Sequence, residues 1–265
     1  MRSPNGAVVA ELQNLARAVH RKLDRRLTLR RGEVTVSPFG RPARFKVRNS
    51  LDYARLVVGS DELEVLGALI ERLRPDDLFW DVGGHLGLFS VHVAQAIGAD
   101  RVIAFEPDPE YAASLRTNLD LNGLQAVRIQ TCALADKPRT DTLHTAGTSG
   151  PSSSLGNQTQ HQPNAVQVRV ESADSLVASG LDAPTVMKVD IEGAEALLLR
   201  GATELLTGSR RPRLIFMEVH PEWLHQFDSS LTEVLRTLLD AGYTVGDVIS
   251  RYNQLHLTAT LPSEG

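Results

Sequence analysis

From residue 77 onward the chain alternates short apolar runs with longer segments of helical periodicity. This alternation is typical of a parallel sheet with helices on both faces, because buried parallel strands are nearly continuous in apolar residues and each crossover needs a helix-sized connection. The predicted strands are 78–82, 101–105, 127–134, 185–191 and 213–219, and the predicted helices are 87–97, 109–121, 193–206 and 229–240.

Two further strand-like segments follow, "YTVGDV" (243–248) and "QLHLTAT" (254–260). Only a short link joins them, so we expect them to pair antiparallel at one edge of the sheet. The sequence therefore predicts an α/β fold with a doubly wound, mostly parallel sheet of seven strands.

The region before the first central strand has a different pattern. Residues 7–30 have the periodicity of an amphipathic helix, residues 33–47 that of a hairpin, and a further helix is expected over residues 60–74. We interpret residues 1–75 as a cap on a domain formed by residues 76–265. The amphipathic helix is expected to pack on that domain, although it could also hold two copies together as a homodimer or contact an acidic partner.

Composition excludes several classes of partner. The net charge of -4 gives no field that would attract nucleic acid or an anionic membrane. No apolar run reaches 18 residues, so neither a membrane span nor a signal peptide is expected, and we predict a cytoplasmic protein. A single cysteine, Cys132, excludes an internal disulfide and is expected to be a buried packing residue.

One long segment interrupts the alternation. Residues 136–165 are rich in Ser, Thr, Gly, Asn and Gln and have no apolar periodicity. Long irregular segments inside compact domains are commonly functional or disordered. We predict a substrate-facing loop here, in preference to a passive linker.

The end of the first central strand reads "DVGGHLG", residues 81–87. It is not the dinucleotide fingerprint, because His85 and Leu88 stand where that pattern needs glycine, and no phosphate-binding loop ending in Gly-Lys-Ser/Thr is present. The pattern is instead D-x-G-G-x-x-G. Its glycines, Gly83, Gly84 and Gly87, permit a tight turn and a close approach to a ligand. Asp81 can accept hydrogen bonds from an ammonium group.

A second acid, Glu106, ends the next predicted strand. An acid in this place binds the ribose hydroxyls in doubly wound folds. A ligand with a ribose and a charged amino acid moiety but no pyrophosphate satisfies both acids, and S-adenosylmethionine is such a ligand.

These segments resemble class I S-adenosylmethionine-dependent methyltransferases, which are Rossmann-like, and more narrowly the FkbM family. The resemblance covers about residues 78–223, and one departure is visible: Gly84-His85 stands where the family usually has Ala-Asn. The blocks that carry the resemblance are "DVGGHLGLFS", "VIAFEPDPEYAASLRTNLDLNG", "CALAD", "GPSSSL", "VMKVDIEGAEALLLRGA" and "LIFMEVHPE".

The resemblance implies cofactor contacts and a reaction. Asp81, Gly83 and Gly87 would surround the methionine part of the cofactor, Glu106 would bind the ribose, and Ala133 and Leu134 would lie near the adenine. The expected reaction is methyl transfer to a hydroxyl of a small molecule, a sugar or a secondary metabolite.

Ionisable residues end the fourth and fifth predicted strands. Asp190 and Glu192 follow the fourth, and Glu218 and His220 follow the fifth, so the four side chains should meet beside the cofactor crevice. We expect neutral His220 to act as base and Asp190 to orient the acceptor or the cofactor, with Glu218 in the same catalytic group. Alternatively, His220 only packs before Pro221, and Glu192 only favours the start of the following helix.

A divalent metal is an alternative occupant of the same group. Asp190, Glu218 and His220 could ligate one, but magnesium and manganese prefer sites made entirely of oxygen ligands. The metal is therefore not favoured, and none is expected.

Two other interpretations differ from the O-methyltransferase in class. The chain could be a non-catalytic S-adenosylmethionine-binding scaffold or sensor, which would bind the cofactor without turnover. A nucleotide-dependent oxidoreductase would share the layered fold, but the absent glycine fingerprint argues against it.

Overall fold

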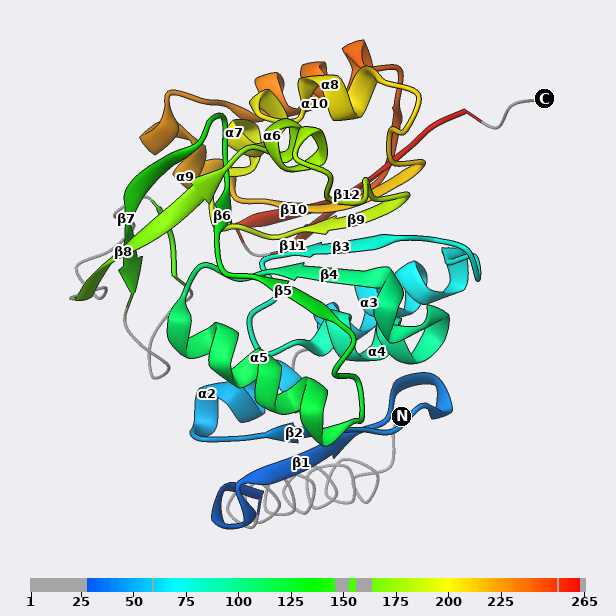
Figure 1. Ribbon diagram of the computed structural model, residues 1–265, viewed down its shortest axis with the longest axis vertical. Helices are drawn as coiled ribbons and strands as arrows, with labels where there is room; N and C mark the ends of the chain where they lie inside the picture. The colour runs from blue at the N-terminus through cyan, green and yellow to red at the C-terminus, as the bar shows by residue number, and fades with distance from the viewer. Residues whose placement is uncertain (1–27, 59, 146–152, 156–163, 252, 263–265) are drawn as a thin grey trace, which may run out of the picture.

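A seven-stranded sheet forms the centre of the computed structural model, which describes residues 28–58, 60–145, 153–155, 164–251 and 253–262. The strands lie in the order β11-β12-β10-β9-β3-β4-β5 (Figure 1). Of these strands only β12 points in the opposite direction, so it pairs antiparallel with both of its neighbours, β10 and β11. The predicted mostly parallel sheet and its antiparallel edge pair are confirmed. Its strands are β3 (Phe79–Val82), β4 (Val102–Phe105), β5 (Arg128–Gln130), β9 (Val186–Val189), β10 (Leu214–Val219), β11 (Thr244–Arg251) and β12 (Gln254–Thr260).

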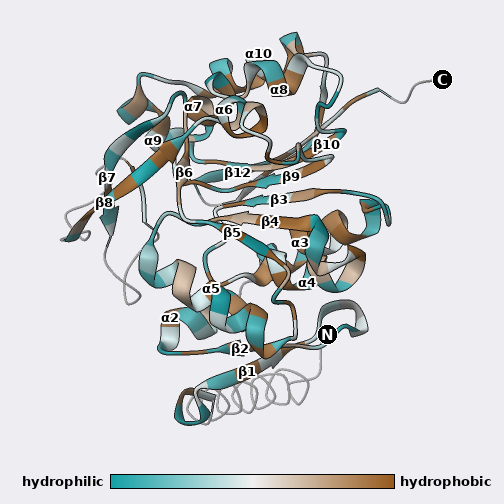
Figure 2. Ribbon diagram, in the orientation of Figure 1, coloured by the Kyte–Doolittle hydropathy of each residue, from teal (hydrophilic) through white to brown (hydrophobic). Residues whose placement is uncertain are grey.

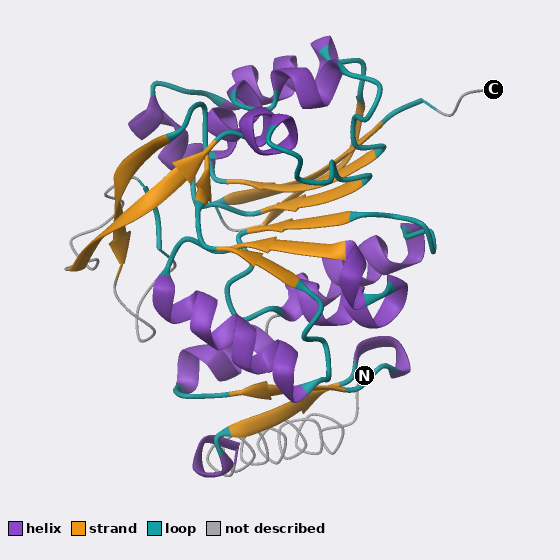
Figure 3. Ribbon diagram, in the orientation of Figure 1, coloured by secondary structure: helices purple, strands orange, loops and turns teal. Residues whose placement is uncertain are grey.

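Helices cover both faces of this sheet (Figures 1 and 3). One face packs against α6 (Ala173–Ala178), α7 (Glu195–Arg200), α8 (Thr203–Thr207) and α10 (Leu231–Asp240), and the other against α3 (Ser60–Arg72), α4 (Leu88–Ile97) and α5 (Pro109–Leu121). Brown, apolar residues concentrate in the central strands in Figure 2, as expected for strands buried on both faces. In the described part of the chain, no helix combines the length and the apolar character that crossing a membrane requires.

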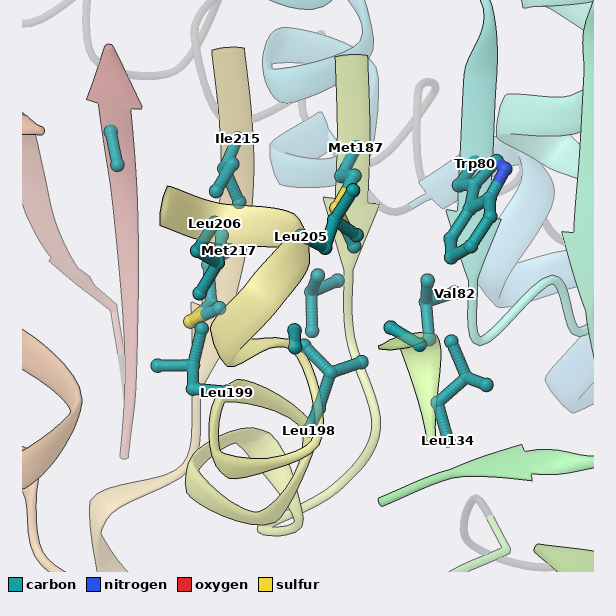
Figure 4. Close-up of a cluster of buried hydrophobic side chains, with 14 of the residues drawn as sticks. Trp80, Val82, Leu134, Met187, Leu198, Leu199, Leu205, Leu206, Ile215 and Met217 are labelled. Atoms are coloured by element: carbon teal, nitrogen blue, oxygen red, sulfur yellow. The ribbon is translucent and has the colours of Figure 1, made fainter. Parts of the chain in front are cut away.

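Successive strand residues serve opposite faces. Trp80 and Val82 of β3 belong to the core under α7 and α8, which Figure 4 shows together with Met187 and Ile215. Phe79 belongs to the core on the α3 and α4 side. This alternation places the side chain of Asp81 on the α4 side as well.

The N-terminal part packs on α5 through a hairpin and short helices. Asn118 Oδ1 accepts a hydrogen bond from Lys46 N and Asn122 Oδ1 accepts one from Arg44 N, both at 2.8 Å. The predicted hairpin is confirmed, and a division of the chain at residue 75 stays a prediction. The predicted helix over residues 7–30 and its dimer contact lie almost entirely outside the described residues. The elements are β1 (Glu33–Val36), η1 (Pro38–Gly40), β2 (Ala43–Lys46), α2 (Ser50–Tyr53) and the π-helix η2 (Ala54–Val58).

The predicted strand over 127–134 is wrong as a single strand. Its first half is β5 of the central sheet, whereas β6 (Ala133–Leu134) pairs with β8 (Asn164–Glu171) in a separate three-stranded sheet of order β6-β8-β7. Apolar residues in both halves concealed the break, because β6 is buried and β5 is half-buried, each against a different neighbour.

The predicted loop over 136–165 is also wrong in part, because β7 (Arg139–Thr145) is a strand that pairs antiparallel with β8. Only Leu143 and Thr145 of β7 are buried, so its sequence has no apolar run. Residues 146–152 and 156–163 lie outside the described part.

The predicted helix over 193–206 is two helices, α7 and α8. Gly201 ends α7 where a Cβ atom would lie 2.0 Å from the carbonyl oxygen of Ala135. The chain must therefore turn closely against the start of the three-stranded sheet at this point. The remaining short elements are η3 (Ala99–Arg101), α9 (Pro221–Leu224) and η5 (His225–Phe227).

Candidate active site

A cavity lies at the carboxyl ends of β3, β4 and β9, where the strand order changes direction. Ligands of open parallel sheets bind at such a point. Asp81 and Gly87 do not line this cavity. The predicted residues that do are Gly83, Gly84, Glu106, Ala133, Leu134, Asp190 and Glu192.

The glycines are required by the packing of the protein itself. Gly83 has φ +87°, and a Cβ there would lie 1.9 Å from the carbonyl oxygen of Asp190. Gly87 has φ +89°, and its Cβ would lie 2.5 Å from Leu115 Cδ1. The loop can therefore lie against β9 and α5 only with glycine at these positions. Close approach to a ligand, the expected reason, is not needed to explain Gly87.

Asp81 is buried behind the cavity rather than in its wall. Its Oδ2 accepts hydrogen bonds from Ser90 N at 3.0 Å and Ser90 Oγ at 2.6 Å, and its Oδ1 lies 3.7 Å from Lys188 Nζ. Burial raises the pKa of Asp81, and the Lys188 cation opposes this shift. Asp81 is thus suited to hold the start of α4 and to balance a buried charge.

Lys188 connects β9 to the glycine loop. It lies opposite Asp81 in the β3–β9 register, and its Nζ donates to Gly83 O at 3.0 Å and contacts Asp190 Oδ2 at 3.3 Å. Burial alone would lower the pKa of Lys188, but Asp190 and Asp81 outweigh it and raise the pKa. No sequence prediction named Lys188, although a lysine inside an apolar strand indicates a buried ion pair.

Asp190 is the ionised carboxylate beside Lys188 in the cavity wall. Burial would raise the pKa of Asp190, but Lys188 and His220 outweigh it and lower the pKa. The carboxylate therefore stays charged at neutral pH and can accept hydrogen bonds from a cationic or hydroxyl donor.

Glu106 is held by two backbone amides. His85 N donates to Oε2 and Asp108 N donates to Oε1, both at 2.8 Å. Each carboxylate oxygen can accept a further hydrogen bond. Burial raises the pKa of Glu106 to about 7, against the effect of the two amides. In its ionised form Glu106 offers a pair of neighbouring hydroxyls in the cavity two acceptors in fixed positions.

Arg55, on η2, brings a cation from the N-terminal part into the cavity wall. Its Nη1 lies 2.7 Å from His85 Nε2 and 3.2 Å from the Tyr111 hydroxyl. Burial and then the charge of Arg55 lower the pKa of His85 well below its ordinary value, so His85 accepts from the guanidinium. No motif surrounds Arg55, so the sequence offered no signal for it.

His220 has an environment that disagrees with the expected neutral base. Its Nδ1 lies 2.8 Å from Glu195 Oε1, and its Nε2 lies 3.4 Å from Glu192 Oε2 and 3.5 Å from Glu218 Oε1. Burial would lower the pKa of His220, but Glu195 and Glu218 outweigh it and raise the pKa to about 11. The imidazole is therefore protonated at neutral pH and cannot accept a proton. His220 also does not line the cavity described above; it lines a separate one with Trp223.

The expected acid cluster does assemble. Asp190, Glu218 and His220 offer possible ligand atoms that lie within 4.8 Å of one another. Lys188 and the protonated His220 already place positive charge beside these carboxylates, and a divalent cation would have to displace that charge. We assign no metal to this cluster.

Comparison with known proteins gives a family match over more than half of the chain. The model of the methyltransferase FkbM domain matches residues 81–245. Hexuronic acid methyltransferase AglP of Haloferax volcanii is 28% identical over 182 residues, which cover 68% of this chain and 72% of that protein. 31-O-demethyl-FK506 methyltransferase FkbM of Streptomyces tacrolimicus is 26% identical over 202 residues, covering 65% and 75%. 2-O-methyltransferase NoeI of Sinorhizobium fredii is 24% identical over 180 residues, covering 62% and 72%.

Proposed function

Because this chain belongs to the FkbM methyltransferase family, a family of S-adenosylmethionine-dependent enzymes, we propose that it methylates a hydroxyl oxygen of a small molecule, a sugar or a secondary metabolite. Two of the relatives are named for transfer to an oxygen, and another is named for a sugar acid. These names support the oxygen acceptor without identifying it.

The lining of the cavity fits the cofactor. Glu106 would accept the two ribose hydroxyls, and the apolar Ala133 and Leu134 would lie against the adenine. Asp190 would accept hydrogen bonds from the ammonium group, while Arg55 would pair with the carboxylate. The bound cofactor supplies an electrophilic methyl group on a sulfonium, so the protein has to hold the acceptor oxygen in line behind it.

The protonated His220 has a supporting part in this proposal. Its single positive charge attracts the carboxylates of Glu195, Glu192 and Glu218 and so helps to keep the ends of β9 and β10 together. Glu218 keeps its place in the cluster as a partner of His220. Neither residue then has to exchange a proton with the acceptor.

The placement of Glu106, with both oxygens fixed by backbone amides, carries the cofactor assignment. The test is calorimetric titration of S-adenosylmethionine into the wild type, Glu106→Ala and the control Glu110→Ala, whose side chain is exposed on α5. We expect Glu106→Ala to weaken binding roughly tenfold or more, or about 1.4 kcal/mol. Unchanged affinity, or binding of a nicotinamide dinucleotide instead, would contradict the assignment.

The reaction is tested separately, with cofactor labelled in the methyl group. Incubation with a panel of hydroxylated compounds should give product labelled at oxygen. Cofactor binding without transfer to any oxygen would favour the alternative of a binding protein without turnover.

A further inference from the structure

A second cavity adjoins the cofactor cavity on the α3 side of the sheet. It lies between α3, the strands β9, β10 and β12, and the bulged part of β11, and has a volume of about 400 Å³. This volume is within the range of small-molecule sites, roughly 300 to 1,000 Å³. Glu62, Phe89, Lys188 and Asp190 line both cavities, so the two spaces meet at these side chains.

We propose that the methyl acceptor binds in this second cavity, as an uncharged hydroxylated molecule with an apolar face, and that Glu62 accepts the proton of the reacting hydroxyl. The inference rests on the proposed O-methyl transfer. In the step, the acceptor oxygen forms a bond to the methyl carbon while the carbon–sulfur bond breaks and its electron pair stays on sulfur. The hydroxyl proton moves to the Glu62 carboxylate, so atoms and charge balance.

Glu62 has the position that a base needs. It is partly buried on α3 and borders both the cofactor space and the second cavity. Within the described ranges it forms no hydrogen bond or ion pair with another side chain, unlike Asp190, which Lys188 engages. Because no described side chain holds it by a hydrogen bond or ion pair, the Glu62 carboxylate can turn to a hydroxyl that enters from the second cavity.

The electrostatic surroundings of Glu62 suit proton transfer. Burial and then the nearby Asp190 raise the pKa of Glu62 to about 7, while Lys188 opposes the shift. A general base is most effective when its pKa lies near the working pH. The charged groups that act on it are Lys188 on β9, Asp190 directly after β9, Glu218 on β10 and Arg55 on η2. The other titratable or charged groups that line the second cavity are Glu64, Arg72, Asp247 and His256.

The charges of the cavity disfavour an anionic acceptor. Its two long cations are already engaged: Arg72 Nη2 lies 2.8 Å from Asp247 Oδ2, and Lys188 Nζ lies 3.3 Å from Asp190 Oδ2. A carboxylated acceptor would therefore approach the Glu62 carboxylate without a cation of its own to pair with. An uncharged molecule avoids that repulsion.

The walls favour a molecule with an apolar face. Val65 and Phe216 line the cavity, and Val248 and Ile249 line it from the β11 bulge while staying 56% and 46% exposed. Large apolar side chains left exposed together commonly mark a binding site. Hydroxyl groups near Glu62 and an apolar face near β11 would match the two ends of the cavity.

The binding test uses a matched pair of probes, phenyl β-D-glucopyranoside and phenyl β-D-glucuronide. They differ only at C6, where the first has a hydroxymethyl group and the second a carboxylate. Each is titrated by NMR into the full chain loaded with S-adenosylhomocysteine. We expect the glucoside to bind roughly tenfold or more tightly than the glucuronide. Ala68→Phe, which places a ring in the cavity, should abolish glucoside binding, and Glu71→Phe, on the exposed side of α3, should not.

Three results would overturn the cavity assignment: no binding of the glucoside, equal or tighter binding of the glucuronide, or glucoside binding that Ala68→Phe leaves unchanged. S-adenosylmethionine affinity is measured for every variant. If the wild type does not bind S-adenosylmethionine, the proposed function itself is refuted. If it binds S-adenosylmethionine but gives any of the three results, only this inference is refuted.

The role of Glu62 is tested by methyl transfer from labelled cofactor to the glucoside. Glu62→Gln should lower kcat roughly 100-fold or more, as expected for loss of a general base. It should leave KM and cofactor affinity near the wild-type values. It should also remove the increase of kcat with pH that the wild type is expected to show around pH 7, where Glu62 loses its proton. Glu71→Gln is the control. A kcat for Glu62→Gln within about twofold of the wild type would contradict the assignment, and so would a wild type that binds the glucoside but does not methylate it.

Discussion

Removal of the Lys188 cation should destabilise the protein strongly. Its Nζ lies 3.7 Å from Asp81 Oδ1 and 3.3 Å from Asp190 Oδ2, and Lys188 and Asp81 are only 6% and 1% exposed. Lys188→Met leaves Asp81 buried without its cation. Breaking a buried pair by removal of one partner costs about 3–5 kcal/mol. We expect a comparable loss in the free energy of unfolding, with Tm lower by roughly 10 °C.

The assay is urea unfolding followed by tryptophan fluorescence, since Trp80 is buried against Phe105 in the core. Lys46→Met is the matched control, because Lys46 Nζ lies 3.4 Å from Glu33 Oε2 on the surface. This variant should lose less than about 1 kcal/mol in the free energy of unfolding. The double variant Asp81→Asn with Lys188→Met should recover part of the loss, because the unpaired charge is gone.

The pH dependence has a definite sign. Burial already raises the pKa of Asp81, and loss of Lys188 should raise it further. A carboxyl whose folded pKa lies above its unfolded value destabilises the protein at higher pH, and the penalty shrinks as the pH falls. The deficit of Lys188→Met should therefore be larger at pH 7 than at pH 5. A deficit below about 1 kcal/mol that does not vary with pH would refute this reasoning.

Three further variants test the glycine loop, the acid cluster and the N-terminal cation. Gly83→Ala should weaken S-adenosylmethionine binding by roughly tenfold or more, because its Cβ would lie 1.9 Å from a backbone oxygen. The control Gly246→Ala, with open space around it, should bind as the wild type does, and equal affinities of the two variants in a titration would contradict the prediction. The free energy of unfolding of the wild type should exceed that of His220→Gln most below pH 6.5, and the difference should fall as the pH rises toward about 11, since the folded pKa of His220 is raised. A difference in urea unfolding that grows with pH would contradict this. Arg55→Met should raise the pKa of His85 in an NMR titration of the imidazole, and an unchanged pKa would show that the guanidinium has no influence there.

Much of the architecture could be predicted because its causes are local. An apolar run of four or five residues buried on both faces looks the same wherever it lies in the sheet, and a turn that needs positive φ selects glycine in its own sequence, as at Gly83. The acid at the end of β4, Glu106, could be placed beside the glycine loop for the same reason, because parallel strands end at a common edge.

The failures occurred where the partner is distant or polar. Every residue of β7 except Leu143 is polar, and the strand is stabilised by backbone pairing with β8, so it has no apolar signature. The run over 127–134 contains two strands of different sheets, and periodicity cannot distinguish two short buried strands from one long strand.

By itself, the sequence determined the order of strands and helices, the glycine turn and the ends of the strands at which charged residues gather, because each depends on residues close together along the chain. The tertiary structure decided what those charges do. Asp81 meets Lys188 across 107 residues of sequence, and Glu195 meets His220 across 25, which converts an expected neutral base into a cation. The charge state of a side chain depends on its burial and its neighbours, and only the folded chain brings those neighbours together.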